Sequence, residues 1–278
     1  MARIGLIAGN GRFPFLALQG ARGLGHDVTV VAVKEEAFPE LEEAARAAGA
    51  DLHWVSLGHL GKCIKILKEA GAGQAVMAGQ VKHAKIFSGI LPDLTLLSVI
   101  TKLRAKNTDA LIAAVAEVLK NNGIELLNST AFLEPLLARA GALSRRGPSA
   151  EELDDLAFGY RMADAIAALD IGQTIAVKHK AVVAVEAMEG TDEVIGRAGQ
   201  LAGPGVRIVK VAKPRQDMRF DVPVIGLATI QAMRVAGASA LSIDAQRTLV
   251  LDGEHVFRSA NEASIAIVGR PIAEGHRG

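Results

Sequence analysis

From residue 213 to residue 221 the chain carries a charged side chain at every second position. These residues are Lys213, Arg215, Asp217, Arg219 and Asp221. In an extended backbone successive side chains point to opposite faces, so the alternation predicts three cations and two carboxylates on one side. Carboxylates suit a metal cation, and Lys or Arg suits a phosphate. The segment could therefore hold a metal ion and a phosphate together.

A solvated edge strand with mutually paired charges is the alternative for this segment. Pro214 and Pro223 bracket it, and a proline cannot donate a ladder hydrogen bond, so a long regular strand is disfavoured and a fixed, curved loop is favoured. Fully extended, Asp217 and Asp221 would stand about 13 Å apart, which is too far to share one ion. A metal site therefore requires the chain to bend between them, or requires one carboxylate to bind metal and the other to position water.

The first half of the chain alternates runs typical of strands with helical runs. The predicted strands are residues 3–8, 27–33, 52–55, 74–78 and 124–127. Strands separated by helices of this length predict a parallel sheet with helices on both faces. Ligands of such sheets bind at the carboxyl ends of strands. The turns at Gly9–Gly11, Gly79–Lys82 and Asn128–Thr130 follow strands, so we group them as one binding rim, with ordinary turn and cap residues as the alternative.

Gly9 and Gly11 begin a dinucleotide-binding fingerprint that the sequence does not complete. Pro14 stands where the third glycine would fall, and no acidic residue stands clearly where a ribose would require one. A classical NAD site is therefore disfavoured. Residues 86–100 are rich in large apolar side chains, which predicts either a packed helix pair or a groove for a hydrocarbon chain.

The second half begins after a stretch of linker composition at Ser144–Ser149. We therefore place a domain boundary between residues 143 and 144, giving domains 1–143 and 144–278. Ser149 and Glu152 form a capping box for a helix that runs to about Leu169. Residues 178–180 are the expected tip of a β-hairpin.

Acidic side chains also gather upstream of the alternating segment. Glu186, Glu189 and Asp192 fall within seven residues of one another in the same predicted domain as Asp217 and Asp221. Thr191, which lies among them, is typical of a helix N-cap.

Composition narrows the class of protein. The chain has 278 residues, enough for two domains, and its net charge of +1 with 4% aromatic residues argues against a nucleic-acid partner. Cys63, the single cysteine, predicts a reducing, cytoplasmic compartment, and no stretch reaches the 18 apolar residues of a membrane span. The seven histidines lack zinc-site spacing, so Mg²⁺ or Mn²⁺ is the expected metal.

Four runs of the sequence are specific enough to suggest a family. They are Gly5–Pro14, Gly79–Val81, Val185–Asp192 and, above all, Lys213–Gly226. Together they resemble the LpxI-type UDP-2,3-diacylglucosamine pyrophosphatases of Gram-negative lipid A synthesis, over nearly the whole chain. One departure is the hairpin tip at residues 178–180, where a glycine-bearing turn is expected.

The resemblance implies an α/β protein with a Rossmann-like amino-terminal domain and a separate α+β catalytic domain, with the glycolipid held between them. It implies metal-dependent hydrolysis of UDP-2,3-diacylglucosamine to UMP and 2,3-diacylglucosamine 1-phosphate (lipid X), with attack on the phosphorus next to the sugar. Asp221 matches the family's essential catalytic aspartate. On this basis the catalytic candidates are Asp221, Lys213, Arg215 and Arg219, the metal candidates are Asp221, Asp217 and Asp192, and the substrate-binding candidates are Asn10, Gly11, Gly79, Gln80, Val81, Asn128, Ser129 and Thr191.

Other functions stay open at this point. A sugar-nucleotide-binding protein without hydrolysis is the alternative from another class, and an NAD(P) oxidoreductase is the alternative among enzymes. The expected partners are UDP-2,3-diacylglucosamine, lipid X and, transiently, the cytoplasmic face of the inner membrane. A homo-oligomer is left open.

Overall fold

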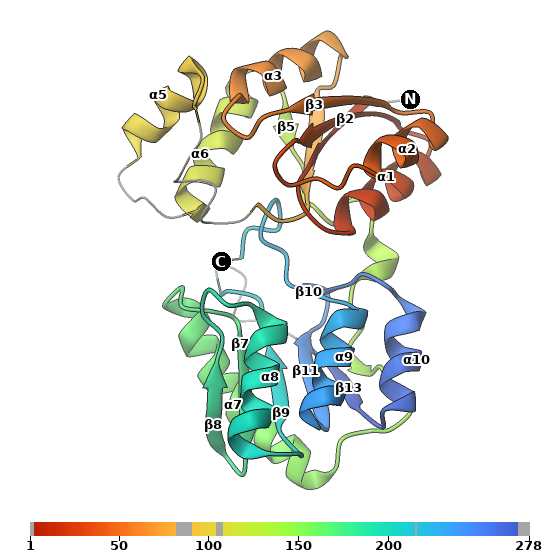
Figure 1. Cartoon of the computed structure of the whole chain (residues 1–278), viewed down its shortest axis with the longest axis vertical. Helices are drawn as coiled ribbons and strands as arrows, with labels where there is room; N and C mark the ends of the chain where they lie inside the picture. Colours follow the sequence, from red (N-terminus) through yellow and green to blue (C-terminus); the bar gives the residue numbers. More distant parts are fainter. Residues whose placement is uncertain (1–2, 82–90, 104–107, 215, 272–278) are drawn as a thin grey trace. The chain divides into compact units, whose positions relative to one another are not determined.

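The computed structural model describes residues 3–81, 91–103, 108–214 and 216–271. Contacts divide the chain into two compact units, which we describe separately (Figure 1). The first unit is Met1–Glu134 with Met218–Phe220, and the second is Pro135–Asp217 with Asp221–Gly278. The sequence predicted the boundary after residue 143. Residues from Pro135 onward group with the second unit because a short strand at Gly141–Ala142 joins its sheet.

The first unit is built on a five-stranded sheet in the order β3-β2-β1-β4-β5. Its strands are β1 (Arg3–Ala8), β2 (Asp27–Val33), β3 (Asp51–Val55), β4 (Gln74–Ala78) and β5 (Glu125–Leu126). All their pairings are parallel, which confirms the predicted Rossmann-like sheet. The chain builds outward from β1 to β3, then returns to place β4 on the other side of β1. The strand order therefore reverses between β1 and β4.

Helices cover both faces of this sheet. They are α1 (Phe13–Gly23), α2 (Leu41–Ala47), α3 (Leu60–Glu69), α5 (Leu94–Lys102) and α6 (Thr108–Asn121). One core cluster joins α3, α5 and α6 to β2, β3 and β4 through side chains such as Leu67, Val99 and Leu119. Helix α1 packs against β1 and β2 on the other face, and begins with Pro14 in its first turn, where a missing N–H costs nothing.

Three residues from the second half of the chain complete the first unit. Ser129 N donates to the Met218 carbonyl at 2.8 Å, and Ser129 Oγ lies 2.6 Å from the carbonyl oxygens of both Met77 and Arg219. The Phe220 ring packs against the core cluster of α3, α5 and α6. Buried Ser129 and half-buried Phe220 thus fix Met218–Phe220 in the first unit.

The second unit is built on a six-stranded sheet in the order β6-β13-β11-β9-β7-β8. Its strands are β6 (Gly141–Ala142), β7 (Thr174–Lys178), β8 (Ala181–Val185), β9 (Arg207–Lys210), β11 (Ala240–Asp244) and β13 (Ala266–Arg270). Strands β9, β11 and β13 are parallel, whereas β6, β7 and β8 join by antiparallel pairing. A separate parallel pair is formed by β10 (Val224–Ile225) and β12 (Leu249–Val250). The mixed sheet confirms the predicted α+β character of this half.

Helices sandwich the six-stranded sheet (Figure 1). Helix α7 (Ala150–Ala168) packs on one face, and α8 (Thr191–Ala202), α9 (Leu227–Ala236) and α10 (Glu254–Glu262) pack on the other. Successive side chains of β9 point to opposite faces of the sheet. Ile208 belongs to the core under α8 and α9, and Val209 belongs to the core under α7. The next residue, Lys210, therefore faces the side of α8.

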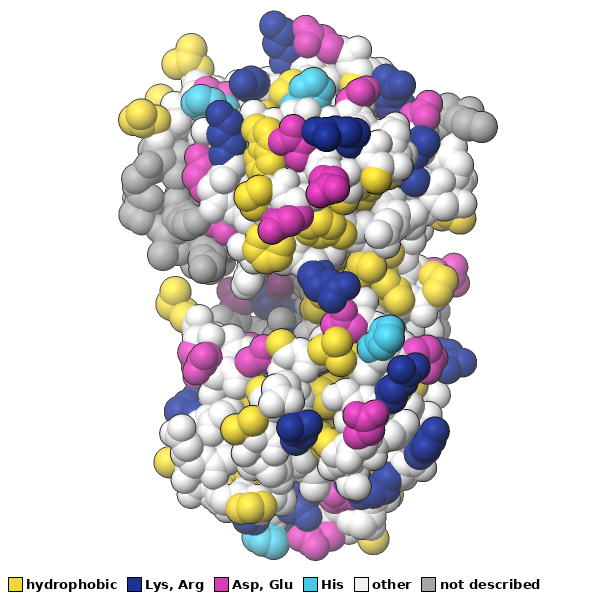
Figure 2. All heavy atoms as spheres, turned by 45° about the vertical axis from the view of Figure 1, so that its right-hand side comes forward, with side chains coloured by type: hydrophobic (Ala, Val, Ile, Leu, Met, Phe, Trp, Pro, Cys, Tyr) yellow, Lys and Arg dark blue, Asp and Glu magenta, His cyan; other side chains and the backbone are white. Residues whose placement is uncertain are grey.

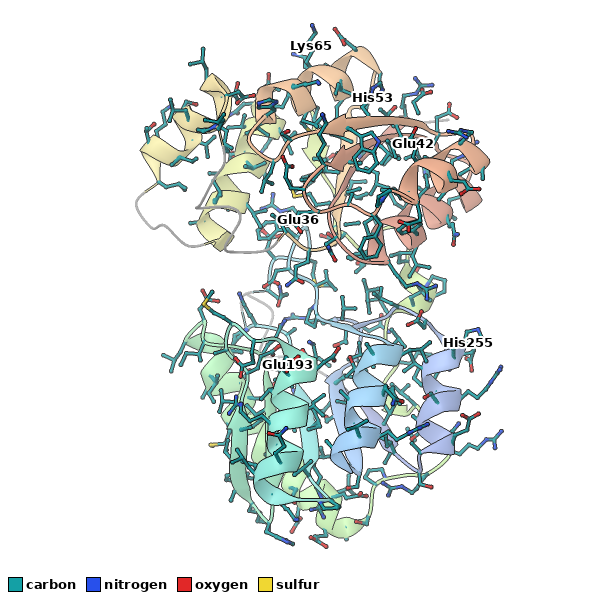
Figure 3. The ribbon with its side chains drawn as sticks, in the orientation of Figure 1. Glu36, Glu42, His53, Lys65, Glu193 and His255 are labelled. Carbon is teal, nitrogen blue, oxygen red and sulfur yellow. The ribbon has the colours of Figure 1, made fainter. Side chains whose placement is uncertain are left out.

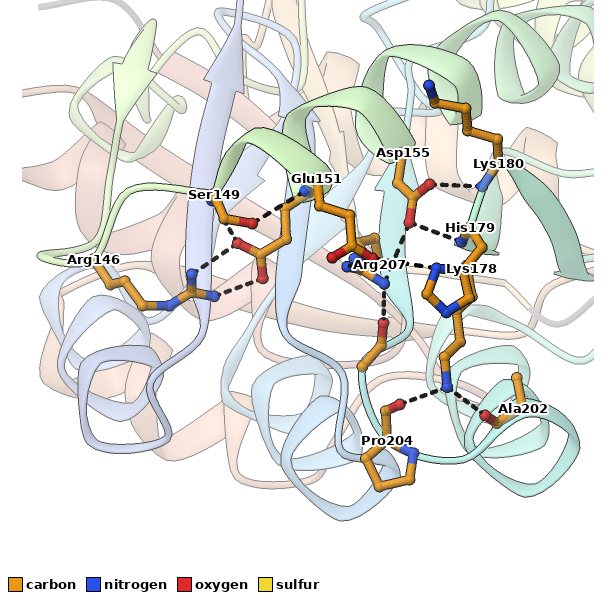
Figure 4. A network of polar contacts seen from close by, with 12 residues as sticks. Arg146, Ser149, Glu151, Asp155, Lys178, His179, Lys180, Ala202, Pro204 and Arg207 are labelled. Carbon is orange, nitrogen blue, oxygen red and sulfur yellow. Dashed lines mark hydrogen bonds and ion pairs between the residues drawn. The ribbon is translucent and has the colours of Figure 1, made fainter.

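The predicted hairpin is present as β7 and β8, but its turn is not made by glycine. His179 and Lys180 form the tip with φ of 51° and 57°, which is uncommon for residues with side chains. The carboxylate of Asp155 on α7 accepts the backbone N–H groups of both residues, at 3.0 and 2.7 Å (Figure 4). Asp155 therefore supplies the restraint that replaces the expected glycine-bearing turn.

Candidate functional site

The polar residues of the second unit gather where β8 and β9 end and β7 begins. Lys210, the last residue of β9, pairs in register with Thr174, the first residue of β7. Glu186 follows β8, and its backbone N–H donates to Thr174 O at 2.8 Å. The first turn of α8 lies at the same edge, because Thr191 contacts both Thr174 and Glu186. One sheet edge thus collects side chains from four elements.

The segment that follows β9 bends back on itself. Gln216 holds the bend: its backbone N–H donates to Lys213 O, its Oε1 accepts from Lys213 N, both at 2.9 Å, and its Nε2 donates to Asp221 O. Asp221 N in turn donates to Asp217 O at 3.3 Å. The chain therefore bends between the two aspartates, as a shared site requires, instead of forming the regular alternating strand. Arg215 lies outside the described residues.

Lys213 and Asp221, two of the predicted catalytic residues, form an ion pair. Lys213 Nζ lies 3.0 Å from Asp221 Oδ2 and 2.7 Å from Asp170 Oδ1. The backbone before Lys213 is fixed by buried Asp244 at the end of β11, which accepts from Ala212 N at 2.8 Å. Burial raises the pKa of Asp244. Sequence reasoning missed Asp170 because nothing near it in the sequence marks it.

Lys210, the last residue of β9, lies three residues before Lys213 in the chain. Its Nζ donates to Thr191 Oγ1 at 2.6 Å, and Thr191 Oγ1 donates to Glu186 Oε1 at 2.9 Å. Both charged residues are buried, with 5% of Lys210 and 7% of Glu186 exposed. Burial lowers the pKa of Lys210, while Glu186, Asp192 and Asp221 act in the opposite direction. The only sequence signal for Lys210 was a cation inside the largely apolar run 206–212, which it shares with Arg207.

The remaining predicted residues of this unit lie at the start of α8 and in the bend. Asp192 is exposed in the first turn of α8, beside Glu193 (labelled in Figure 3). Thr191 does not cap the helix by its side chain, since its hydroxyl is engaged by Lys210 and Glu186. The carboxylate of Glu189 forms an ion pair with Arg197 at 2.5 Å.

The predicted rim of the first unit forms where the strand order reverses. Asn10 follows β1 and Gln80 follows β4, and they join by two backbone hydrogen bonds of 2.8 and 3.1 Å. The two loops approach closely: a Cβ at Gly9 would lie 2.8 Å from Gln80 O, and one at Gly79 would lie 2.5 Å from Asn10 O. Reversal points of parallel sheets are common ligand sites. The structure thus brings the turns after β1 and β4 together.

Other rim residues differ in what they can offer a ligand. Asn128 and Gln80 are exposed, and Gly11 and Val81 are partly exposed. Ser129 is only 2% exposed, and its polar atoms are directed to backbone groups of the first unit. The Asn10 side chain donates to the carbonyl of Glu36 (labelled in Figure 3) at 3.1 Å. Ser129 therefore anchors the chain in this structure, whereas Gln80 and Asn128 present side chains to the surface.

Two domain families match the chain. The LpxI N-terminal domain matches residues 3–136, and the LpxI C-terminal domain matches residues 139–268. The chain belongs to the LpxI family. The UDP-2,3-diacylglucosamine pyrophosphatase LpxI of Caulobacter vibrioides is 32% identical to it over 97% of this chain and 98% of that protein.

Two solved structures resemble the chain only weakly. An imine reductase from Myxococcus stipitatus is 10% identical with a TM-score of 0.26, covering 95% of this chain and 58% of its own. A phosphoribosylglycinamide formyltransferase from Anaplasma phagocytophilum is 15% identical with a TM-score of 0.29, covering 98% and 99%. Both scores are too low to support a shared fold.

The donor set for a metal ion is sparse in this LpxI chain. Within the described residues, no group of three or more His, Cys, Asp or Glu side chains is placed to hold a metal ion. Asp221 is paired with Lys213, and Asp192 is exposed on α8. Mg²⁺ often takes one or two carboxylates together with phosphate oxygens of a substrate. A magnesium site at these residues would therefore need substrate oxygens in addition to the carboxylates.

Cys63 is buried, and charged side chains of both signs are mixed on the face drawn in Figure 2. On the face drawn in Figure 2, Lys and Arg side chains are interspersed with Asp and Glu side chains and form no large basic patch. Burial raises the pKa of Cys63 to about 12, so its thiol is poorly suited to act as a nucleophile. None of the described helices combines the length and the hydrophobicity of a membrane span.

Proposed function

We propose that this LpxI-family chain hydrolyses the pyrophosphate bond of UDP-2,3-diacylglucosamine, releasing UMP and 2,3-diacylglucosamine 1-phosphate (lipid X), a step of lipid A biosynthesis. The observation that carries the proposal is the match to both LpxI domains over residues 3–136 and 139–268. The relative of that name from Caulobacter vibrioides, aligned over 97% of the chain, supports it. The matched ranges include the rim after β1 and β4, and they also include Lys210, Lys213 and Asp221.

The chemistry of the bond explains the mixture of charges. A pyrophosphate repels an incoming hydroxide, so the site must place cations where negative charge develops. In our assignment Asp221 orients the attacking water, and Lys213 offsets the charge on the phosphates, with Arg215 and Arg219 in the same role. The 3.0 Å contact between Lys213 and Asp221 supports a shared site for these two residues. Water adds to the phosphorus next to the sugar, and the bond to the bridging oxygen breaks to release UMP.

A divalent cation is part of the proposal. Asp221, with Asp217 or Asp192, would hold Mg²⁺ or Mn²⁺, because hard cations prefer carboxylate oxygens. When bound, the ion neutralises phosphate charge and lowers the pKa of coordinated water. The backbone hydrogen bond from Asp221 to Asp217 supports the pairing of these two residues.

The rim of the first unit is the proposed site for the uridine or glucosamine group. Asn10, Gly11, Gln80 and Asn128 would contact it, together with the backbone of Gly79 and Val81. Support comes from the reversal of strand order between β1 and β4, where open parallel sheets commonly bind ligands.

The acyl chains of the substrate call for an apolar contact. Leu94 and Leu97 in the first turn of α5 are 86% and 44% exposed, and Leu91, three residues before the helix, is 86% exposed. Leu94 and Leu97 are three residues apart in the helix, so they share one side of it. We assign this leucine face to contact with acyl chains or the inner-membrane surface. The neighbouring residues 86–90 of the predicted groove lie outside the described residues.

Hydrolysis is tested by incubating the purified chain with UDP-2,3-diacylglucosamine and Mg²⁺ and measuring UMP. We expect UMP from the unaltered chain, and a loss of about 100-fold or more for Asp221→Ala with substrate binding retained. Binding of the substrate without UMP release would favour a sugar-nucleotide-binding protein. Fluorescence titration with NADH tests the oxidoreductase alternative, and we expect no saturable binding.

The leucine face is tested by flotation with vesicles. We expect Leu94→Glu to weaken association with phospholipid vesicles that contain anionic lipid, because it places a charge in an apolar contact. Unchanged flotation of this variant would reject the assignment of α5.

A further inference from the structure

The ammonium of Lys210 has an unusual environment. An ammonium group can donate three hydrogen bonds. Among the described residues, Lys210 Nζ donates to the neutral hydroxyl of Thr191, at 2.6 Å. The same hydroxyl donates a hydrogen bond to Oε1 of buried Glu186, at 2.9 Å. Lys210, Thr191 and Glu186 thus form a chain of contacts that begins in β9 and ends after β8, with α8 in the middle.

Stability of the fold gives little reason for a lysine at this position. Moving an ammonium out of water costs several kcal/mol unless paired groups compensate, and an apolar side chain of similar size is often neutral or stabilising there. The neighbouring residues of β9, Ile208 and Val209, are fully buried and apolar. The ammonium therefore needs a reason other than core packing.

The contacts of Lys210 supply that reason. Thr191 is the first residue of α8, and Asp192 follows it directly. The N-cap of this helix, Gly190, has no side chain to fix the first turn. The bond from Lys210 and the bond to Glu186 therefore tie the start of α8 to the sheet edge from which the chain leads to Lys213.

We propose that Lys210 is a positioning residue of the LpxI reaction, which acts through Thr191 and Glu186 to hold the first turn of α8, and with it Asp192, at the sheet edge that carries Lys213 and Asp221. The inference rests on the proposed hydrolysis. Lys210 is too deeply buried to touch a substrate in this structure, so it acts through Thr191 and not as a catalytic residue.

The test compares steady-state hydrolysis of UDP-2,3-diacylglucosamine by the full chain and by Lys210→Met, Thr191→Val and the double variant. A misplaced group of about 1 Å can cost about 100-fold in rate. We expect each single variant to lower kcat by about that factor with KM changed less than about threefold. We expect the double variant to lose no more than either single variant, because both changes break one chain of contacts.

A conservative variant and a control at another lysine separate positioning from general damage. Thr191→Ser keeps the hydroxyl, and we expect it to recover at least tenfold of the rate that Thr191→Val loses. Lys178→Met is the matched control, since Lys178 lies in the same sheet but donates to the carbonyls of Ala202 and Pro204 at the opposite end of α8. We expect Lys178→Met to keep its kcat. If Lys210→Met alone fails to fold, Lys210→Met with Glu186→Gln removes both buried charges and is measured instead.

The outcomes distinguish this inference from the proposed function. Absence of UMP with the unaltered chain would reject the hydrolysis itself. Normal hydrolysis by the unaltered chain, together with unchanged kcat in Lys210→Met and Thr191→Val, would overturn the positioning role alone. Equal losses in Thr191→Ser and Thr191→Val would do the same, because the hydroxyl would then have no part.

Discussion

Lys213 Nζ lies 3.0 Å from Asp221 Oδ2, so the predicted catalytic aspartate is already held by a cation that belongs to the same bend. The same ammonium lies 2.7 Å from Asp170 Oδ1. A cation between two carboxylates can release one of them to a substrate while it stays paired with the other. We therefore expect Asp170 to balance Lys213 when Asp221 contacts a substrate.

The first prediction compares the two carboxylates that contact Lys213. We expect Asp221→Asn to lower kcat by about 100-fold to 10,000-fold, the range for loss of a residue that handles protons. Asp170→Asn leaves the contact between Lys213 and Asp221 in place, so we expect a loss of less than about tenfold. Release of UMP measures both. Equal losses in the two variants would contradict the separate roles.

The second prediction concerns the anchor that Ser129 provides. Ser129→Ala removes a hydroxyl within 2.6 Å of the carbonyls of Met77 and Arg219. Leaving buried acceptors unsatisfied costs about 1 to 3 kcal/mol, so we expect that loss in the free energy of unfolding by urea. Thr29→Val is the control, because Thr29 is buried in the same unit and its Oγ1 has no hydrogen-bond partner among the described residues. A larger loss for Thr29→Val would contradict the anchor.

The third prediction concerns how the free energy of unfolding depends on pH through Glu152. Burial alone would raise the pKa of Glu152, but hydrogen bonds from Arg146 and from Ser149 at the start of α7 outweigh it and lower the pKa to about 2 (Figure 4). The folded state therefore gains stability above the ordinary pKa of 4.5, by about 3 kcal/mol. This stability is lost as the pH falls from about 4.5 to about 2. We expect Glu152→Gln to unfold more easily at pH 7 by about 2 to 3 kcal/mol, with a difference that shrinks in that window.

Glu254→Gln is the control for this measurement. Glu254 is an exposed acid in the first turn of α10, where the helix dipole contributes about 0.3 to 1 kcal/mol. Urea unfolding of both variants between pH 2 and pH 7 measures the difference. A pH-independent effect of Glu152→Gln would show that the ion pair with Arg146 does not carry the stability.

The fourth prediction concerns the close approach of the two rim loops. Gly79 has φ of 90°, and a Cβ there would lie 2.5 Å from Asn10 O. Gly123 has a similar φ of 80°, but a Cβ there would meet nothing within 4 Å. We expect Gly123→Ala to cost about 1 kcal/mol, the penalty of the backbone conformation alone. We expect Gly79→Ala to cost at least about 1 kcal/mol more, measured by thermal unfolding, and similar losses would reject the steric role.

The parallel sheet of the first unit could be predicted from the sequence because its strands are short apolar runs spaced by helices. The ranges 3–8, 27–33 and 74–78 agree with β1, β2 and β4. Helix α10 was not predicted, because its only buried side chains are Val256 and Ala260 and most of its other residues are polar. Local periodicity thus predicts elements with a wide apolar face and misses those with a narrow one.

Less of the candidate site than of the fold could be predicted from the sequence. The bend at Lys213–Asp221 could be inferred from its prolines and charges, but the partners Asp170 and Lys210 come from distant or apolar stretches. Their roles depend on the pairing of β7 with β9, which no local pattern encodes. The hairpin tip at residues 179–180 likewise depends on Asp155, a residue of α7.

The chain passes from one unit to the other three times, because Met218–Phe220 belongs to the first unit and the residues on both sides of it belong to the second. A gene truncated after the amino-terminal half would encode a protein without Phe220 and without the carbonyl that accepts from Ser129 N. The two halves are therefore poor candidates for independent expression or for exchange between homologues, even though each matches a separate domain family.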